Sequence, residues 1–301
     1  MATSLTSPGL VAAGDKAIIA ARKHLEFVKL FATDFTDEAV KPFTTLKVPV
    51  FAGTAADFNP GSSHGYNDTE GTIKWAAIEF GTHKKCTFGL QDKERLLVDT
   101  DPFWGKCGVA AGQGVGVALV GEITSKLVYT AATQITSWSA TLANMAALRG
   151  SCATNNLDPA RCVVVLEPVS YAAILAALPA NVLGDGSALV SGVAPGLFGF
   201  KAVVEGTTIS KQSGADVNKG VGFIVPEDAL AIGARVIRPQ DGVCEEWGTT
   251  TDEITGLTLG HRVTVNQNSG ERFYTVEALI GAALTDQSSN GAPTILQLVT
   301  A

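Results

Sequence analysis

The chain has 301 residues and a formal net charge of −7, from 22 Lys and Arg against 29 Asp and Glu. Because 46% of the residues are apolar and only 17% are charged, the composition excludes an intrinsically disordered chain and predicts a large hydrophobic core. The sequence has no run of about 18 apolar residues, and residues 1–24 lack a basic segment ahead of an apolar core. We therefore expect a soluble, cytosolic protein, and its acidic balance argues against strong nucleic-acid binding over the whole surface.

The first predicted element is a helix over residues 15–31. Ile18, Leu25 and Val28 recur at helical spacing, with basic residues between them. The apolar stripe is incomplete, so we expect this helical arm to complete its burial on another chain.

Two strand patterns follow, over Thr45–Phe51 and Thr72–Phe80, and a third covers Cys86–Leu90. The first two are separated by about 20 residues rich in Gly, Ser, Asn and Asp. A connection of that length without structure of its own is usually functional or disordered. A two-stranded hairpin is marginally stable alone in water, so this one is expected to lie on another subunit.

Residues 103–130 predict one long helix of about 28 residues, or about 40 Å. Its many glycines each cost about 1 kcal/mol relative to alanine, which only close packing against a neighbour would offset. The same glycines do not form the dinucleotide-binding pattern G-x-G-x-x-G, because Val117 stands where the last glycine is required and no strand precedes it. A packing face of small residues is the better interpretation.

The rest of the chain alternates helices and strands. We predict a helix from Ser137 to about Gly150, a buried strand at Cys162–Leu166 and a short helix after Pro168. Strands are predicted at 200–205 and 221–225, a short helix at 226–233 (PEDALAIG), and closing strands at 244–251, 257–267 and 272–284, with a hairpin turn at 268–270. The predicted fold class is α+β, with one long helix and mostly non-parallel strands.

No catalytic, cofactor or metal site is predicted. The five cysteines form no C-x-x-C pair, so buried free thiols are expected in place of disulfides or a zinc site. The four histidines belong to no nucleophile motif, and Ser63 beside His64 is a sequence neighbour without triad geometry.

Taken in order, the segments resemble the major capsid proteins of tailed phages, which have the Hong Kong 97 fold. The matching stretches cover about residues 35–286, and their order and spacing carry the inference. They are TLKVPVFAGTAADFN, TIKWAAIEFGTHKKCTFGLQDKE, the long glycine-rich helix, RCVVVLEPVSYAAILAAL, LFGFKAVVEGTTIS, VGFIVPEDALAIGARV, TGLTLGHRVTV and GERFYTVEALIGAAL.

The resemblance implies a domain organisation and a set of contact residues. The implied parts are an N-terminal arm (1–44), an extended loop (45–91), a peripheral domain with a spine helix (92–136), an axial domain (137–236), further peripheral strands (237–284) and a C-terminal tail (285–301) that would return to the axial domain. The loop would reach over a neighbouring subunit, with these candidate contact residues at its tip: Phe58, Asn59, Pro60, His64, Tyr66 and Asn67.

The implied function is a non-enzymatic shell protein of the virion, made in the host cytoplasm and needing no cofactor. Its partners would be copies of itself in hexamers and pentamers, the portal, scaffolding or decoration proteins, and packaged double-stranded DNA through weak contacts, but no membrane. The low charged fraction suits a protein that buries much of its surface against partners, although compositional drift would give the same value. The alternatives are an encapsulin-like compartment shell and, less favoured, an α+β enzyme with an unrecognised site.

Overall fold

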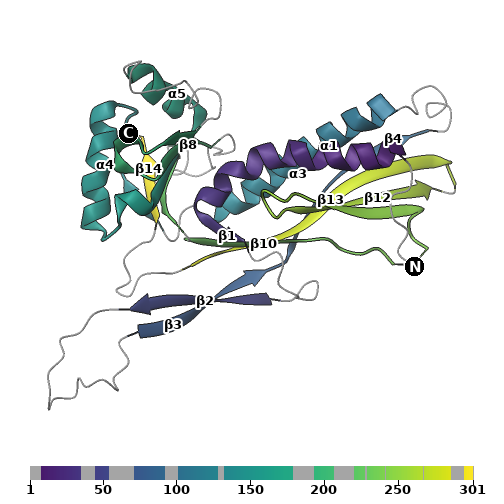
Figure 1. The fold of residues 1–301 in the computed structure, drawn as a ribbon, viewed down its shortest axis with the longest axis horizontal. Coiled ribbons are helices and arrows are strands. Elements are labelled where there is room, and N and C mark those ends of the chain that lie inside the picture. The colour runs from purple at the N-terminus through teal and green to yellow at the C-terminus, as the bar shows by residue number, and fades with distance from the viewer. Residues whose placement is uncertain are drawn as a thin grey trace, which may run out of the picture.

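The computed structural model describes residues 8–34, 45–53, 71–91, 101–127, 132–178, 193–206, 220–227, 229–240, 242–266, 268–285 and 295–300. These residues form two lobes, each with its own β-sheet, and a two-stranded hairpin that projects from the first lobe (Figure 1). The mixture of long helix and largely antiparallel sheet confirms the predicted α+β class.

The first lobe is built around one long central strand, β13 (Glu271–Leu284). β4 pairs with it over Arg272–Ile280, and β12 and then β10 pair with successive parts of its other edge. All of these pairings are antiparallel, and short β1 adds in parallel to β10. The remaining strands of this sheet are β1 (Ala32–Asp34), β4 (Thr82–Leu90), β10 (Leu230–Arg235), β11 (Glu246–Thr251) and β12 (Thr258–Asn266).

Two helices lie side by side over one face of this sheet (Figure 1). They are α1 (Pro8–Leu25), which continues as the 3-10 helix η1 (Glu26–Leu30), and α3 (Asp101–Lys126). By length and composition alone α3 could cross a membrane, but 56% of its apolar stretch is buried within the fold, as is typical of a core helix. Leu119, Ile123 and Tyr274 lie in the core between the helices and the sheet.

The second lobe contains a mixed sheet covered by helices. Its strand order is β5 (Ala132–Ile135), β14 (Ile295–Val299), β9 (Gly220–Pro226), β6 (Cys162–Leu166), β8 (Ala202–Glu205) and β7 (Val193–Pro195). Its helices are α4 (Leu142–Thr154), η2 (Pro159–Arg161), α5 (Pro168–Ala177) and η3 (Leu197–Gly199). β14 comes from the end of the chain and inserts between β5 and β9, so the C-terminal region contributes to the core of this lobe.

One predicted helix is wrong. A helix is predicted at 226–233, but Leu230–Arg235 is strand β10 and pairs with β13. Leu230 and Ala231 are fully buried, on opposite faces of the strand, and Gly233 leaves room for the Phe80 ring, 2.8 Å from where its Cβ would lie. Pairing inside the sheet therefore overrides the local helix preference of this short alanine-containing segment.

Two helix starts also differ from the prediction. The first helix begins at Pro8, before the predicted start at residue 15. The helix expected from Ser137 begins at Leu142, where the Thr141 side chain accepts a hydrogen bond from the backbone N–H of Asn144. A threonine at this N-cap position satisfies a backbone N–H that the first helical turn leaves without a partner.

Candidate subunit interface

The predicted hairpin is present, and the part of it furthest from the tip, which we call its root (residues 45–49 and 75–79), packs on the first lobe. It consists of β2 (Thr45–Gly53) and β3 (Gly71–Glu79), paired antiparallel from Thr45 opposite Glu79 to Gly53 opposite Gly71. One face, which we call the inner face, buries four side chains against β10 and β13 together with Phe80. These are Leu46, Val48, Ala76 and Ile78.

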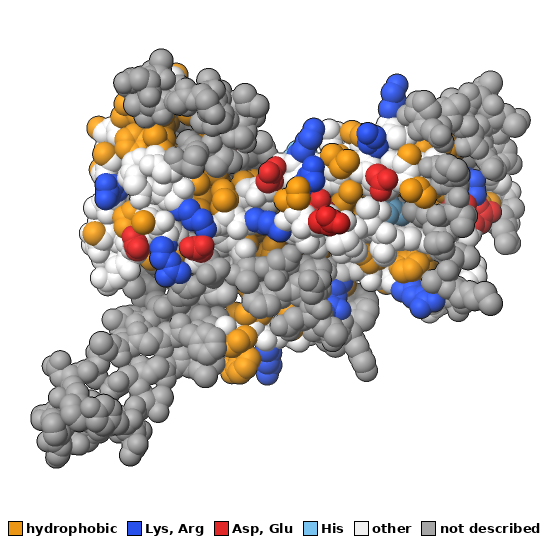
Figure 2. Space-filling view, viewed as in Figure 1, with side chains coloured by type: hydrophobic (Ala, Val, Ile, Leu, Met, Phe, Trp, Pro, Cys, Tyr) orange, Lys and Arg blue, Asp and Glu red, His pale blue; other side chains and the backbone are white. Residues whose placement is uncertain are grey.

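The opposite face of the hairpin, the outer face, is exposed. Its side chains are Thr45, Lys47, Pro49, Trp75, Ala77 and Glu79. Trp75 lies directly opposite Pro49 and is 61% exposed. Figure 2 shows hydrophobic side chains beside a basic one over this part of the molecule. Since the root is held in place, the hairpin presents this face away from its own subunit.

The predicted tip residues lie outside the described part of the chain. Phe58, Asn59, Pro60, His64, Tyr66 and Asn67 all belong to residues 54–70. Trp75 is not among the predicted contact residues, although strand alternation in TIKWAAIEF indicates its exposure. With Ala76 and Ile78 assigned to the buried face, the same alternation places Trp75 on the exposed one.

The glycines of α3 are explained by close packing against α1, as the sequence analysis required. A Cβ atom at Gly108 would lie 2.1 Å from the carbonyl oxygen of Ala13, and one at Gly112 would lie 2.1 Å from that of Ala17. A Cβ at Gly116 would likewise lie 2.9 Å from the Cα of Ala21. The two helices therefore run in the same direction, and at every fourth residue along their contact a glycine of α3 faces an alanine of α1.

This contact corrects the expectation that the first helix completes its burial on another chain. Ala13, Ala17 and Ala21 are 0% exposed, and the stripe that appeared incomplete is covered by α3 of the same chain. The stripe is narrow because alanine lets two helix backbones approach closely, so large apolar residues are not needed along it.

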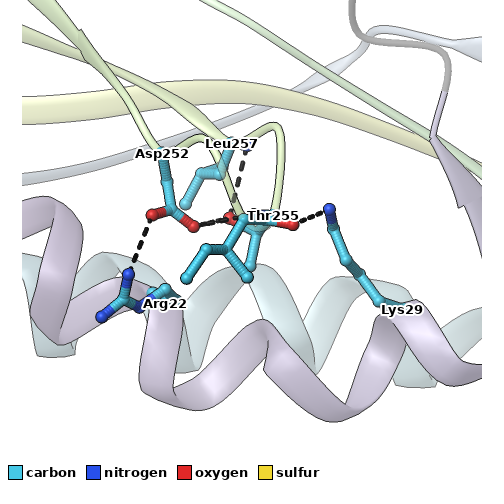
Figure 3. Close-up of polar contacts among 6 residues, drawn as sticks. Arg22, Lys29, Asp252, Thr255 and Leu257 are labelled. Atoms are coloured by element: carbon cyan, nitrogen blue, oxygen red, sulfur yellow. Dashed lines mark hydrogen bonds and ion pairs between the residues drawn. The ribbon is translucent and has the colours of Figure 1, made fainter.

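Polar contacts also hold α1 to the first sheet, as Figure 3 shows. Arg22 lies 3.3 Å from a carboxylate oxygen of Asp252 in the turn between β11 and β12, and Lys29 donates to the backbone oxygen of Ile254. The other Asp252 oxygen accepts from the Thr255 backbone N–H at 2.8 Å and its hydroxyl at 2.6 Å. Asp252 is only 6% exposed, so this turn and α1 depend on each other.

The buried histidine His261 sits between α1 and the first sheet. Its Nδ1 lies 3.0 Å from the Tyr274 hydroxyl, while its Nε2 is buried without a partner and lies 3.5 Å from where a Cβ of Gly14 would be. Burial lowers the pKa of His261 to about 4, and burial raises the pKa of Tyr274. The imidazole is therefore neutral at physiological pH.

A second histidine, His83, faces the buried carboxylate of Glu277 at 3.0 Å. An ion pair would raise the pKa of His83, yet burial and then Arg262 and Lys85 lower it. We favour a hydrogen bond from a neutral imidazole, because Arg262 already pairs with the other oxygen of Glu277.

The described residues contain no group of three or more His, Cys, Asp or Glu side chains that could hold a metal ion. The cysteines are all free: Cys107, Cys152 and Cys162 are buried, and Cys86 and Cys244 are half-buried. The ionisable side chains described above thus make hydrogen bonds and ion pairs inside the fold.

The fold as a whole is similar to that of solved capsid structures. The capsid asymmetric unit of cyanophage A-1(L) matches with a TM-score of 0.55 and 14% identity, over 93% of this chain and 92% of that one. The capsid structure of cyanophage P-SCSP1u matches with a TM-score of 0.53 and 14% identity, over 91% of this chain and 88% of that one. The chain has a phage capsid fold.

The capsid fold is shared more widely than among phages. A virus-like particle from Pyrococcus furiosus matches with a TM-score of 0.50 and 13% identity, over 95% of this chain and 97% of that one. No protein-family model and no curated protein matches the sequence. The similarity therefore lies in the capsid fold, and it confirms the fold inferred from the order of the sequence segments.

Proposed function

We propose that this chain is a major capsid protein, which self-assembles into the icosahedral head of a tailed phage around double-stranded DNA. The observation that carries the proposal is the extent of the match to capsid structures, since the match to the capsid asymmetric unit of cyanophage A-1(L) covers 93% of this chain and 92% of that one. A match of this extent includes both lobes.

The described elements support the domain organisation implied by the resemblance. In this proposal residues 45–91 are the extended loop, residues 92–136 contain the spine helix α3, and residues 137–236 form the axial domain. Three strands depart from these bounds: β4 and β10 belong to the sheet of the first lobe, and β5 belongs to the sheet of the second. The second sheet supports the last assignment, since most of its strands come from that range and β14 of the 285–301 tail joins them. The hairpin root supports the first, because only its inner face is covered by its own subunit.

The proposed partners are copies of the chain in hexamers and pentamers, together with a portal and scaffolding or decoration proteins. The role is structural and non-catalytic, in a virion whose subunits are made in the host cytoplasm. Packaged DNA would make only weak, non-specific contacts, because a net charge of −7 gives the chain no general attraction for phosphates.

An encapsulin-like compartment is the second candidate, and the match to the Pyrococcus furiosus virus-like particle favours it. Both candidates use the same shell geometry and differ in what the shell contains. Terminase and portal genes beside the coding gene would support the phage head, and a cargo-enzyme gene would support the compartment.

The test is negative-stain electron microscopy of the purified full chain over a range of concentrations. We expect capsomers or closed shells, since repeated heterologous contacts around five- and six-fold positions close a particle. A monomer at every concentration, with a polar pocket that binds a small molecule, would instead support the enzyme alternative.

A further inference from the structure

The outer face of the hairpin carries an aromatic side chain that its own subunit leaves exposed. Trp75 is 61% exposed, and it is the only aromatic among the large hydrophobic side chains that are exposed in the described part of the chain. Pro49 faces it across the hairpin and Ala77 follows it along β3. By contrast, Ile78 on the inner face is 0% exposed. Among the described side chains of the two strands, those of the inner face are thus covered by the subunit itself, and those of the outer face are free to contact a partner.

The charges on this face favour a protein partner. Among its described side chains, the outer face has one cation, Lys47, and one anion, Glu79, so these give no net positive charge to attract nucleic acid or an anionic lipid surface. Tryptophan is enriched among the few residues that dominate binding energy in protein interfaces. A near-neutral face around an exposed tryptophan fits a protein surface that is itself poor in charge, and only 17% of this chain is charged.

The size of the face favours a repeated contact over a stable pair. Two nine-residue strands cover about 30 Å by about 10 Å, or about 300 Å². A stable one-to-one complex needs about 800 Å² on each partner. A contact of this size holds only when many copies of it act together, as they do in a closed shell of identical subunits.

Pro49 indicates that the contact uses the face of the hairpin and not its edge. Within the described residues β2 and β3 pair only with each other, so each has a free edge. Because proline has no N–H to donate, Pro49 disfavours the addition of another strand along the β2 edge. The pyrrolidine ring of Pro49 also adds to the apolar surface around Trp75.

We propose that Trp75, with Pro49 opposite it, anchors the hairpin of one subunit on a second copy of this chain. This inference rests on the proposed shell function and identifies the side chain that makes the contact. It adds a contact on the paired strands β2 and β3 to those predicted for the loop tip.

The test compares Trp75→Ala with Trp75→Phe and with the control Val169→Ala, which shortens a side chain that is 76% exposed on the second lobe. Circular dichroism and the melting temperature of the free subunit should be unchanged in all three, because the altered side chains are exposed. Sedimentation should show that Trp75→Ala raises the concentration needed for shell formation at least tenfold. Trp75→Phe should raise it less, and Val169→Ala should leave it unchanged.

Acrylamide quenching of tryptophan fluorescence gives a second readout. Trp104 and Trp138 are 5% and 4% exposed and Trp247 is half-buried, so Trp75, at 61%, should supply the largest share of the quenching in the free subunit. Assembly of the wild type should protect it, and Trp75→Phe should lack that change. If the wild type forms shells while Trp75 stays quenchable and Trp75→Ala assembles normally, the inference is wrong and the shell function stands. Protection that appears only after a different protein is added would also overturn it, whereas a wild type that never assembles would refute the shell function itself.

Discussion

Replacing one glycine of α3 by alanine tests whether α1 and α3 pack as closely as the structure shows. In Gly112→Ala the new Cβ would lie 2.1 Å from the Ala17 carbonyl oxygen, against about 3.4 Å for an ordinary contact. The obstacle is backbone and cannot rotate away, so the helices must separate by about 1 Å, a gap that forfeits up to about half of each dispersion contact. We expect a cost of about 3 kcal/mol, the upper end for overpacking.

Gly112→Ala also has a favourable effect on stability, and the same substitution at a second glycine, Gly121, measures that effect alone. Alanine is a better helix former than glycine by about 1 kcal/mol, so Gly112→Ala should lower the free energy of unfolding by about 2 kcal/mol net. Gly121→Ala lies in the same helix with nothing within 4 Å of its new Cβ, so it should raise the free energy of unfolding by about 1 kcal/mol.

The assay is urea denaturation of the free subunit, with the fraction folded followed by circular dichroism. The two variants should shift the midpoint in opposite directions with unchanged slopes. If both variants stabilise the subunit equally, α1 does not lie on α3 in the free chain, and the burial of the first helix within its own subunit is refuted.

Three further predictions concern other parts of the molecule. Asp252→Ala should lower the free energy of unfolding by about 1–3 kcal/mol, because Arg22 and the turn lose a buried acceptor. In the same urea titration, Glu253→Ala at the exposed neighbouring position should change it by less than about 0.5 kcal/mol. The pKa of His261 is about 4 in the fold and about 6.5 in the unfolded chain, so the unfolded chain binds more protons between these two pH values. The free energy of unfolding should therefore fall by about 3 kcal/mol as the pH drops from about 6.5 to about 4. His261→Gln should flatten that pH dependence, and an equally steep loss in the variant would assign it to other groups. Deletion of residues 57–67 should impair assembly and leave circular dichroism nearly unchanged, whereas an unfolded product would place this segment in the subunit core.

Elements with a strong local pattern could be predicted from the sequence. The apolar run Cys162–Leu166 is strand β6 with the predicted bounds, and the turn at 268–270 joins β12 to β13, with Gly270 at a φ of 67°. The long helix was found because its length and apolar content leave few alternatives. In each case the residues that decide the structure are neighbours in the chain.

Elements that depend on distant partners could not be predicted. Leu230–Arg235 is a strand because β13, far along the chain, offers a paired edge. The burial of α1 under α3 depends on Ala13 and Ala17 facing Gly108 and Gly112, about 95 residues away. In the sequence, only the four-residue spacing that the two pairs share indicates this contact. The exposure of Trp75 depends on which face of the hairpin the first sheet covers.

A cryo-electron microscopy reconstruction of the assembled particle tests the central claim most directly. We predict a closed shell in which α1 lies on α3 of its own subunit while the outer face of the β2–β3 hairpin contacts a neighbouring copy. A particle whose hairpins lie only on their own subunits, or a chain that stays monomeric throughout, would contradict the account.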